Sequence, residues 1–165
     1  SLSKAYLAPG WRTGWLVVGR TPRLDDVLAG IRKMADGRLC SAGPMQYAVA
    51  PALDGDRSHQ REFAAALKAR AEVTTRRLSA IPGMSCVMPK AAFYAMPRVE
   101  LPEGRTDQDF VLGLLRSQGI LCVYGSGFGM PADQGYFRVV FLAAPSDLEN
   151  ICDHIAEFTT EFLQA

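Results

Sequence analysis

The start of the chain carries side chains that could form a phosphate site beside a reactive amine. They are two serines, Lys4 and Arg12. Ser1 and Ser3 carry hydroxyl groups, and Arg12 opens an apolar segment. Hydroxyl and guanidinium groups make charge-assisted hydrogen bonds to phosphate oxygens. A lysine beside such a pocket can form a Schiff base with a carbonyl when desolvation or a neighbouring cation lowers its pKa. An arbitrary lysine is usually a solvated surface charge, so these neighbours are what favour a chemical role for Lys4.

Arg138 is the second residue whose position favours chemistry. It lies in the segment 136–142, which is otherwise apolar and rich in strand-forming residues. A charge in such a strand needs a partner, because burying it alone costs several kcal/mol. Two interpretations stay open: an internal salt bridge, or a bidentate clamp for a ligand carboxylate, which arginine geometry suits.

The glycine-rich segment 123–129 does not predict a nucleotide site. It lacks the GxGxxG form that opens a helix, and no lysine follows it as in a P-loop. We interpret it as a loop near a functional site, in which the glycines allow backbone conformations that other residues rarely adopt.

The composition narrows the classes of function. Of 165 residues, 48% are apolar and 21% charged, as in soluble globular domains. No uninterrupted apolar run is long enough for a transmembrane helix. With 18 basic and 17 acidic residues, no basic field exists that would attract nucleic acid or an anionic membrane. We therefore expect neither as a partner, whereas a small anion could still bind one or two arginines.

The cysteines and histidines predict no metal site. The four cysteines are widely spaced and form no CxxC pair: Cys40, Cys86, Cys122 and Cys152. We expect them to be reduced and buried, in a reducing compartment. His59 and His154 show no triad arrangement, and His154 is expected on a helix surface.

Hydrophobic spacing predicts an α/β or α+β chain. A strand covered on both faces is expected over 12–19. Three- and four-residue apolar spacing predicts helices over 22–38, 45–53 and 61–79. Short strands are expected at 85–88, 92–99, 120–123 and 136–143. From about residue 51 onward, these elements predict a compact mixed sheet–helix unit.

Two helices of the second half begin with sequences that resemble capping boxes. Thr106 with Asp109 would open the first, which Gly119 would end. Ser146 with Glu149 would open the second. That helix carries an apolar stripe of Leu148, Ile151, Ile155, Phe158 and Phe162.

The segments around Lys4 and Arg138 resemble the signatures of class I and II pyridoxal-phosphate aminotransferases. Residues 1–14 are similar to the lysine signature, SxxK followed by GxRxG. Gly127-Phe128-Gly129 and residues 137–141 are similar to the carboxy-terminal signature. The closer resemblance is to the bacterial alanine aminotransferase branch. Its segments are similar to residues 38–46, 83–89 and 92–97, whereas Tyr124-Gly125 replaces the Pro-Gly or Gln-Gly frequent there.

The resemblance implies a role for each candidate residue. Lys4 would form a Schiff base with the aldehyde of pyridoxal 5'-phosphate and later move the proton from the substrate Cα. Arg12, with Ser1 and Ser3, would bind the cofactor phosphate, and Arg138 would grip the substrate α-carboxylate. The family transfers an amino group between amino acids and 2-oxo acids in a ping-pong cycle, usually with glutamate and 2-oxoglutarate as one pair.

The resemblance also implies a fold, the carboxy-terminal part of the aspartate-aminotransferase type (fold type I). Residues 1–50 would be the end of the cofactor-binding large domain plus a linking helix, and residues 51–165 the small domain. In the family, the groups that hold the pyridine ring precede the lysine and are therefore absent from this sequence. We expect an inactive fragment, cut from a cytoplasmic homodimeric enzyme.

Alternative functions stay open. A pyridoxal-phosphate-dependent carbon–sulfur lyase or an aminocyclopropane-carboxylate synthase would share Lys4, Arg12 and Arg138. The chain could also be the effector domain of an aminotransferase-like transcription regulator. A helix-turn-helix module upstream of Ser1 would favour the regulator.

Overall fold

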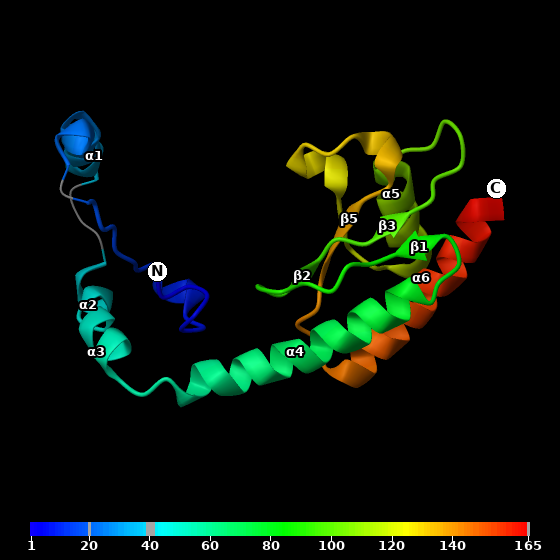
Figure 1. Cartoon of the computed structure of the whole chain (residues 1–165), viewed down its shortest axis with the longest axis horizontal. Helices are drawn as coiled ribbons and strands as arrows, with labels where there is room; N and C mark the ends of the chain where they lie inside the picture. The colour runs from blue at the N-terminus through cyan, green and yellow to red at the C-terminus, as the bar shows by residue number, and fades with distance from the viewer. Residues whose placement is uncertain (20, 39–41, 165) are drawn as a thin grey trace. The chain divides into compact units, whose positions relative to one another are not determined.

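The computed structural model describes residues 1–19, 21–38 and 42–164 (Figure 1). The chain divides into two compact units, residues 1–62 and residues 63–165. Among the described residues, no helix is both long and apolar enough to span a membrane.

The first unit consists of loops and mostly short helices. Its elements are, in order, η1 (Pro9–Trp11), η2 (Pro22–Leu24), α1 (Asp25–Asp36), α2 (Gly43–Gln46) and α3 (Val49–Asp54). The helix predicted over 22–38 is confirmed, and Gly37 is its C-cap. The single helix predicted over 45–53 is instead two short helices separated by a turn at 47–48.

The strand predicted over residues 12–19 is wrong for this structure. These residues form no strand, and Trp15, Leu16 and Val17 are exposed, with Val17 82% exposed. A strand needs neighbours that pair with its backbone and cover its apolar side chains. The described part of the first unit contains no other strand that could supply them.

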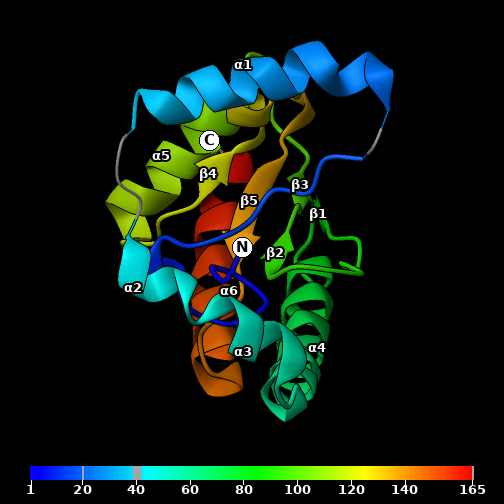
Figure 2. The ribbon, with the colours of Figure 1, turned by 90° about the vertical axis from the view of Figure 1, so that its left-hand side faces the viewer.

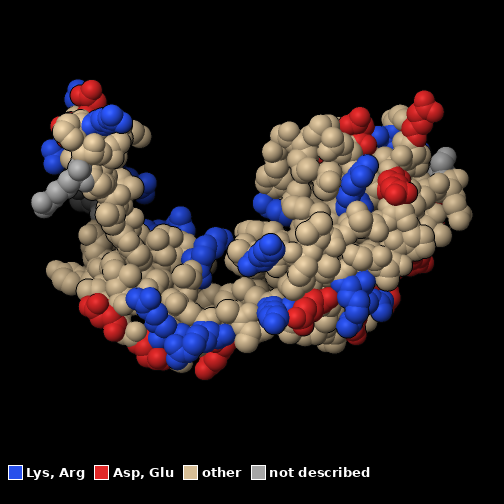
Figure 3. Space-filling view, in the orientation of Figure 1, with Lys and Arg blue, Asp and Glu red and all other residues tan. Residues whose placement is uncertain are grey.

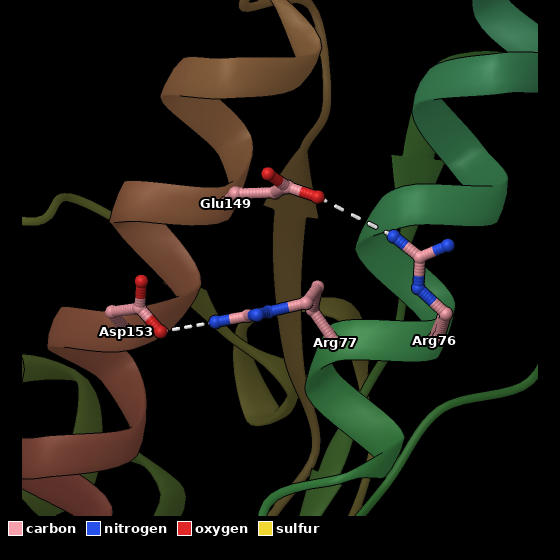
Figure 4. A network of polar contacts seen from close by, with 4 residues as sticks. All are labelled: Arg76, Arg77, Glu149 and Asp153. Carbon is pink, nitrogen blue, oxygen red and sulfur yellow. Dashed lines mark hydrogen bonds and ion pairs between the residues drawn. The ribbon is translucent and has the colours of Figure 1, made fainter.

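Helix α4 (Ser58–Ser79) runs from the first unit into the second and begins at Ser58 rather than at Arg61. Its buried residues Ala71, Thr74 and Leu78 recur every three or four positions, so one face packs inward. Two ion pairs join α4 to α6 (Pro145–Gln164): Arg76 with Glu149 at 3.4 Å, and Arg77 with Asp153 (Figure 4). Such largely exposed pairs contribute at most about 1 kcal/mol each.

The described part of the second unit contains five short strands where four were predicted, because the single strand predicted over 92–99 is two separate strands. Strands β1 (Met84–Ser85) and β3 (Arg98–Val99) pair antiparallel. Strand β5 (Phe137–Val140) pairs antiparallel with β2 (Tyr94–Ala95) on one side and with β4 (Val123–Tyr124) on the other (Figure 2).

Helix α5 (Asp107–Gln118) has the ends that the sequence predicts. The Thr106 N–H donates to Asp109 Oδ2 at 2.9 Å, and the Asp109 N–H donates to Thr106 Oγ1 at 3.2 Å. Gly119 is the C-cap with a left-handed φ of 68°. The second predicted box is wrong, because α6 begins at Pro145 and Ser146 therefore lies inside its first turn.

Alternation along β5 separates the core from an open face. Phe137 and Val139 are buried, whereas Arg138 is half-buried and Val140 is exposed. The core lies on the side of the sheet that the helices cover. There the Phe110 ring of α5 packs against three other rings, with 5.1–5.3 Å between ring centroids: those of Phe137, Phe158 and Phe162. In Figure 2, α6 lies behind the sheet.

Three of the four cysteines lie in the described chain, and they are free thiols. Burial raises the pKa of Cys122 and of Cys152 to about 11. Cys86 is half-buried, and its pKa is raised by burial too. Cys40 lies outside the described residues.

Many polar side chains of the second unit lie on its surface. His154 lies on α6 as predicted, with Nδ1 at 3.0 Å from Gln118 Oε1. On the face drawn in Figure 3, basic and acidic side chains intermix over α4 and α6. No cluster of three or more His, Cys, Asp or Glu that could hold a metal ion occurs within the described ranges.

Candidate active site

The amino-terminal loop of the first unit brings Ser1 against the segment that carries Arg12. The Leu2 N–H donates to the Thr13 carbonyl at 3.0 Å. A Cβ added at Gly14 would lie 2.8 Å from Ser1 Cβ, closer than real carbon atoms pack. Glycine at position 14 is therefore what lets the two segments lie together.

Arg12 adopts a left-handed backbone with φ 52°, which is uncommon for a residue other than glycine. Thr13 Oγ1 donates to the Trp11 carbonyl at 3.1 Å and closes the turn around it. The exposed Arg12 guanidinium donates from Nη1 to the Pro9 carbonyl at 2.7 Å. That bond uses one of its several N–H donors and leaves others for an anion.

Ser1, Ser3 and Lys4 lie on the same loop. The Ser3 N–H donates to Ser1 Oγ at 3.4 Å. The Leu7 N–H donates to the Lys4 carbonyl at 3.1 Å, which folds the residues after Lys4 into a turn. The structure thus gathers four predicted site residues, Arg12 included, on one hydrogen-bonded loop. The serine hydroxyls and the Arg12 guanidinium, on a loop where Ser1 packs closely against Gly14, are hydrogen-bond donors that suit a phosphate group.

Arg138 lies on the open face of the second unit's sheet. Pairing places Val123 opposite Arg138 and Tyr94 opposite Val140, so these four side chains share that face. The guanidinium carbon lies 4.8 Å from the Tyr94 ring centroid and 4.5 Å from that of Phe128.

Arg138 has no anionic partner in the described chain, so the structure does not contain the internal salt bridge that the sequence left open. Its Nε is buried and has no hydrogen-bond partner. Two aromatic rings stabilise the cation electrostatically but satisfy none of its N–H groups. A planar anion such as a carboxylate would satisfy them.

The loop that carries Phe128 is held in place at several points. Residues Gly125–Phe128 form a 3-10 turn, η3. The Gly125 N–H donates to the Tyr136 carbonyl at 2.7 Å. Asp107 accepts two hydrogen bonds from Ser126, from the N–H at 2.6 Å and from the hydroxyl at 2.9 Å. The glycine-rich segment therefore presents Phe128 to Arg138.

Sequence patterns indicated Arg138 but neither the two rings beside it nor the carboxylate that holds the loop of Phe128. Phe128 lies in the Gly-Phe-Gly signature, yet nothing in the spacing shows that its ring meets an arginine. Tyr94 reaches the same face only through strand register. Asp107 follows the capping residue Thr106 and looks like any acidic residue of a first helical turn. Its burial is the signal, and only the structure provides it.

The family pattern described as aminotransferase class I and II matches residues 1–155. Alanine aminotransferases of Mycobacterium bovis and Mycobacterium tuberculosis are 35% identical over 168 residues, which cover 99% of this chain and 39% of each relative. A glutamate-pyruvate aminotransferase, AlaA, of Haemophilus influenzae is 32% identical over 169 residues, 99% of this chain and 41% of the relative.

Solved structures of this family are similar to the chain. An alanine aminotransferase from Pyrococcus furiosus matches with a TM-score of 0.89 and 38% identity over 97% of this chain and 41% of its own. An aminotransferase from Escherichia coli matches with a TM-score of 0.91 and 32% identity, over 99% of this chain and 42% of its own. The chain spans about two fifths of the length of these relatives. It has the fold of the matching part of fold type I aminotransferases, and it belongs to the class I and II aminotransferase family.

Proposed function

We propose that this chain is the carboxy-terminal part of a pyridoxal-phosphate-dependent transaminase. The enzyme exchanges an amino group between an amino acid, in the first place alanine, and 2-oxoglutarate in a ping-pong cycle. The observation that carries the proposal is Arg138, a guanidinium without an anionic partner among the described residues. Relatives named alanine and glutamate-pyruvate aminotransferases support the substrate pair and favour this function over a lyase or a regulator.

The amino-terminal loop fits the cofactor. Pyridoxal 5'-phosphate, when bound, supplies the electron sink for negative charge at the substrate Cα. Ser1 and Arg12 would hold its phosphate, with Ser3 on the same loop, and the Lys4 amine would hold its aldehyde end. The support is the donor set and the close approach of Ser1 to Gly14.

Lys4 and Arg138 would divide the work on the substrate. Once released by the incoming amino acid, the Lys4 amine would take the proton from the substrate Cα and deliver it to the carbon that was the cofactor's aldehyde carbon. The Arg138 fork fixes the α-carboxylate, and such charged hydrogen bonds contribute about 1.5–3 kcal/mol each. Fixing the carboxylate orients the Cα–H bond for removal.

The organisation of the complete enzyme is part of the proposal. Residues 1–50 are assigned to the end of the large domain with a linking helix, and residues 51–165 to the small domain. The complete enzyme is proposed to be a cytoplasmic homodimer. The chain alone is expected to show no turnover in a coupled alanine/2-oxoglutarate assay, because the family's ring-holding groups precede Lys4.

Arg138→Lys in the complete enzyme tests the proposed function. Lysine keeps the charge but loses the fork, so KM for alanine and for 2-oxoglutarate should rise at least about tenfold. The absorbance of bound cofactor should not change. Arg98→Lys is the matched control, since Arg98 also lies near a tyrosine ring but already donates to the Gln134 carbonyl. Loss of cofactor with unchanged KM in Arg138→Lys would show that the assigned role is wrong.

A further inference from the structure

Asp107 is a buried carboxylate in the first turn of α5. It is 1% exposed, whereas Asp109 in the same turn is exposed and belongs to the capping box. A buried carboxylate needs hydrogen-bond donors for its oxygens. In the described chain both oxygens accept from Ser126, 19 residues further along, at 2.6 and 2.9 Å. Asp107 therefore fixes the loop that contains Ser126.

The loop has little freedom once Ser126 is fixed. The Gly125 N–H donates to the Tyr136 carbonyl, and a Cβ at Gly125 would lie 2.7 Å from that same oxygen. The Gly129 N–H donates to the Ser126 carbonyl at 3.1 Å, with a left-handed φ of 86° at Gly129. Phe128 lies between these anchors, so the position of Ser126 determines where the Phe128 ring is presented.

The Phe128 ring is itself half exposed and yet lies 4.5 Å from the Arg138 guanidinium carbon. Without the anchored loop, little packing would hold an exposed ring against a cation. We propose that Asp107 is a positioning residue that acts through Ser126 and Phe128 to orient the Arg138 guanidinium. This inference rests on the proposed carboxylate-binding role of Arg138.

The test uses the complete holoenzyme with Asp107→Asn and Phe128→Leu. Each should raise KM for alanine and 2-oxoglutarate about five- to tenfold, because a partly desolvated cation–π contact is lost. The kcat and the absorbance of bound cofactor should change less than about twofold, because the interaction bears on substrate binding. The double variant should show no more than the larger single effect, because both changes remove the same contact.

Asp109→Asn is the matched control on the same helical turn. It weakens the capping box and should lower Tm without changing KM, since the hydrogen bonds of Asp109 in the described chain go to Thr106 and not to the loop. If Asp107→Asn does not fold, Ser126→Ala replaces it. That variant keeps the N–H bond to Asp107 and should raise KM about two- to threefold.

The outcomes separate the two proposals. A lowered Tm with unchanged KM in Asp107→Asn, or effects that multiply in the double variant, would overturn the positioning role. If Arg138→Lys raises KM and neither Asp107→Asn nor Ser126→Ala does, this inference alone fails. If Arg138→Lys leaves KM unchanged, the proposed function of Arg138 fails first.

Discussion

The two units of the chain bury very different amounts of apolar surface. In the second unit a continuous core joins α5, α6 and the sheet around the rings of Phe110, Phe137 and Phe158. In the described part of the first unit, Leu2 is the buried apolar side chain, while Val17 and Met34 are more than 80% exposed. The second unit therefore has a core of its own that can stabilise it, whereas the described part of the first unit has no comparable core.

The largest expected contrast is in autonomous folding. Residues 58–165, which keep α4 whole, should unfold cooperatively and protect the amides of α5 and α6 from hydrogen exchange. Residues 1–62 should exchange at nearly the rates of an unfolded peptide, because Leu2 is the buried apolar side chain of their described part. Exchange measured by mass spectrometry on the two fragments checks this. Strong protection within 1–62 alone would remove the contrast.

Core truncation should separate the units next. Phe110→Ala removes a side chain that is 0% exposed and should lower the free energy of unfolding by about 3–5 kcal/mol. Met34→Ala in α1 should change it by less than about 0.5 kcal/mol. Urea unfolding of the 165-residue chain measures both. Equal effects of the two variants would contradict a core confined to the second unit.

Two helical glycines provide a smaller and finer contrast. A Cβ at Gly113 of α5 would lie 2.7 Å from Cζ of the buried Phe158 ring, whereas a Cβ at Gly30 of α1 meets nothing within 4 Å. Gly113→Ala should therefore destabilise the chain by about 1–3 kcal/mol. Gly30→Ala should raise the helical signal, because alanine is favoured over glycine by about 1 kcal/mol in a helix. Circular dichroism measures the helical signal, and its change with urea gives the free energy of unfolding of each variant. A Gly113→Ala variant that is more stable than the unchanged chain would show that Phe158 is not held in place.

The smallest effect concerns the ends of helices. Hydrogen bonds from the Thr106 side chain and backbone hold the pKa of Asp109 below its ordinary 3.8, whereas α1 has no side-chain cap at Leu24. A lowered folded pKa adds stability above the unfolded value, and that stability is lost as the pH falls from about 3.8 through the folded pKa.

The pH dependence of urea midpoints tests this point, read at about pH 5 and about pH 2.5. Asp109→Asn should reduce the difference between the two midpoints. An unchanged difference in Asp109→Asn would show that the box contributes nothing to the acid response.

The parts of the fold that sequence could predict are those with local causes. The Thr106–Asp109 box and the glycine at 119 specify the two ends of α5 through hydrogen bonds within a few residues. The strand at 12–19 failed because a strand depends on partners that sequence patterns do not supply. The box at Ser146 failed because the helix already begins at Pro145, so Ser146 lies inside the helix and not just before it.

In the candidate site too, some residues could be predicted from the sequence and others only from the structure. Lys4, Arg12 and Arg138 could be selected because their types and motifs indicate chemistry. Tyr94 and Phe128 became visible only with the sheet register and the anchored loop. Long-range contacts such as that of Asp107 with Ser126 have no signature in local spacing.

The proposed cofactor site is tested most directly by finding which lysine carries the cofactor in the complete enzyme. Borohydride reduction of the holoenzyme, followed by peptide mapping, reads this out, since it fixes the Schiff base in place. We expect the pyridoxyl group on Lys4. Labelling at Lys33, Lys68 or Lys90 with none at Lys4 would contradict the assignment of the amino-terminal loop as the cofactor site.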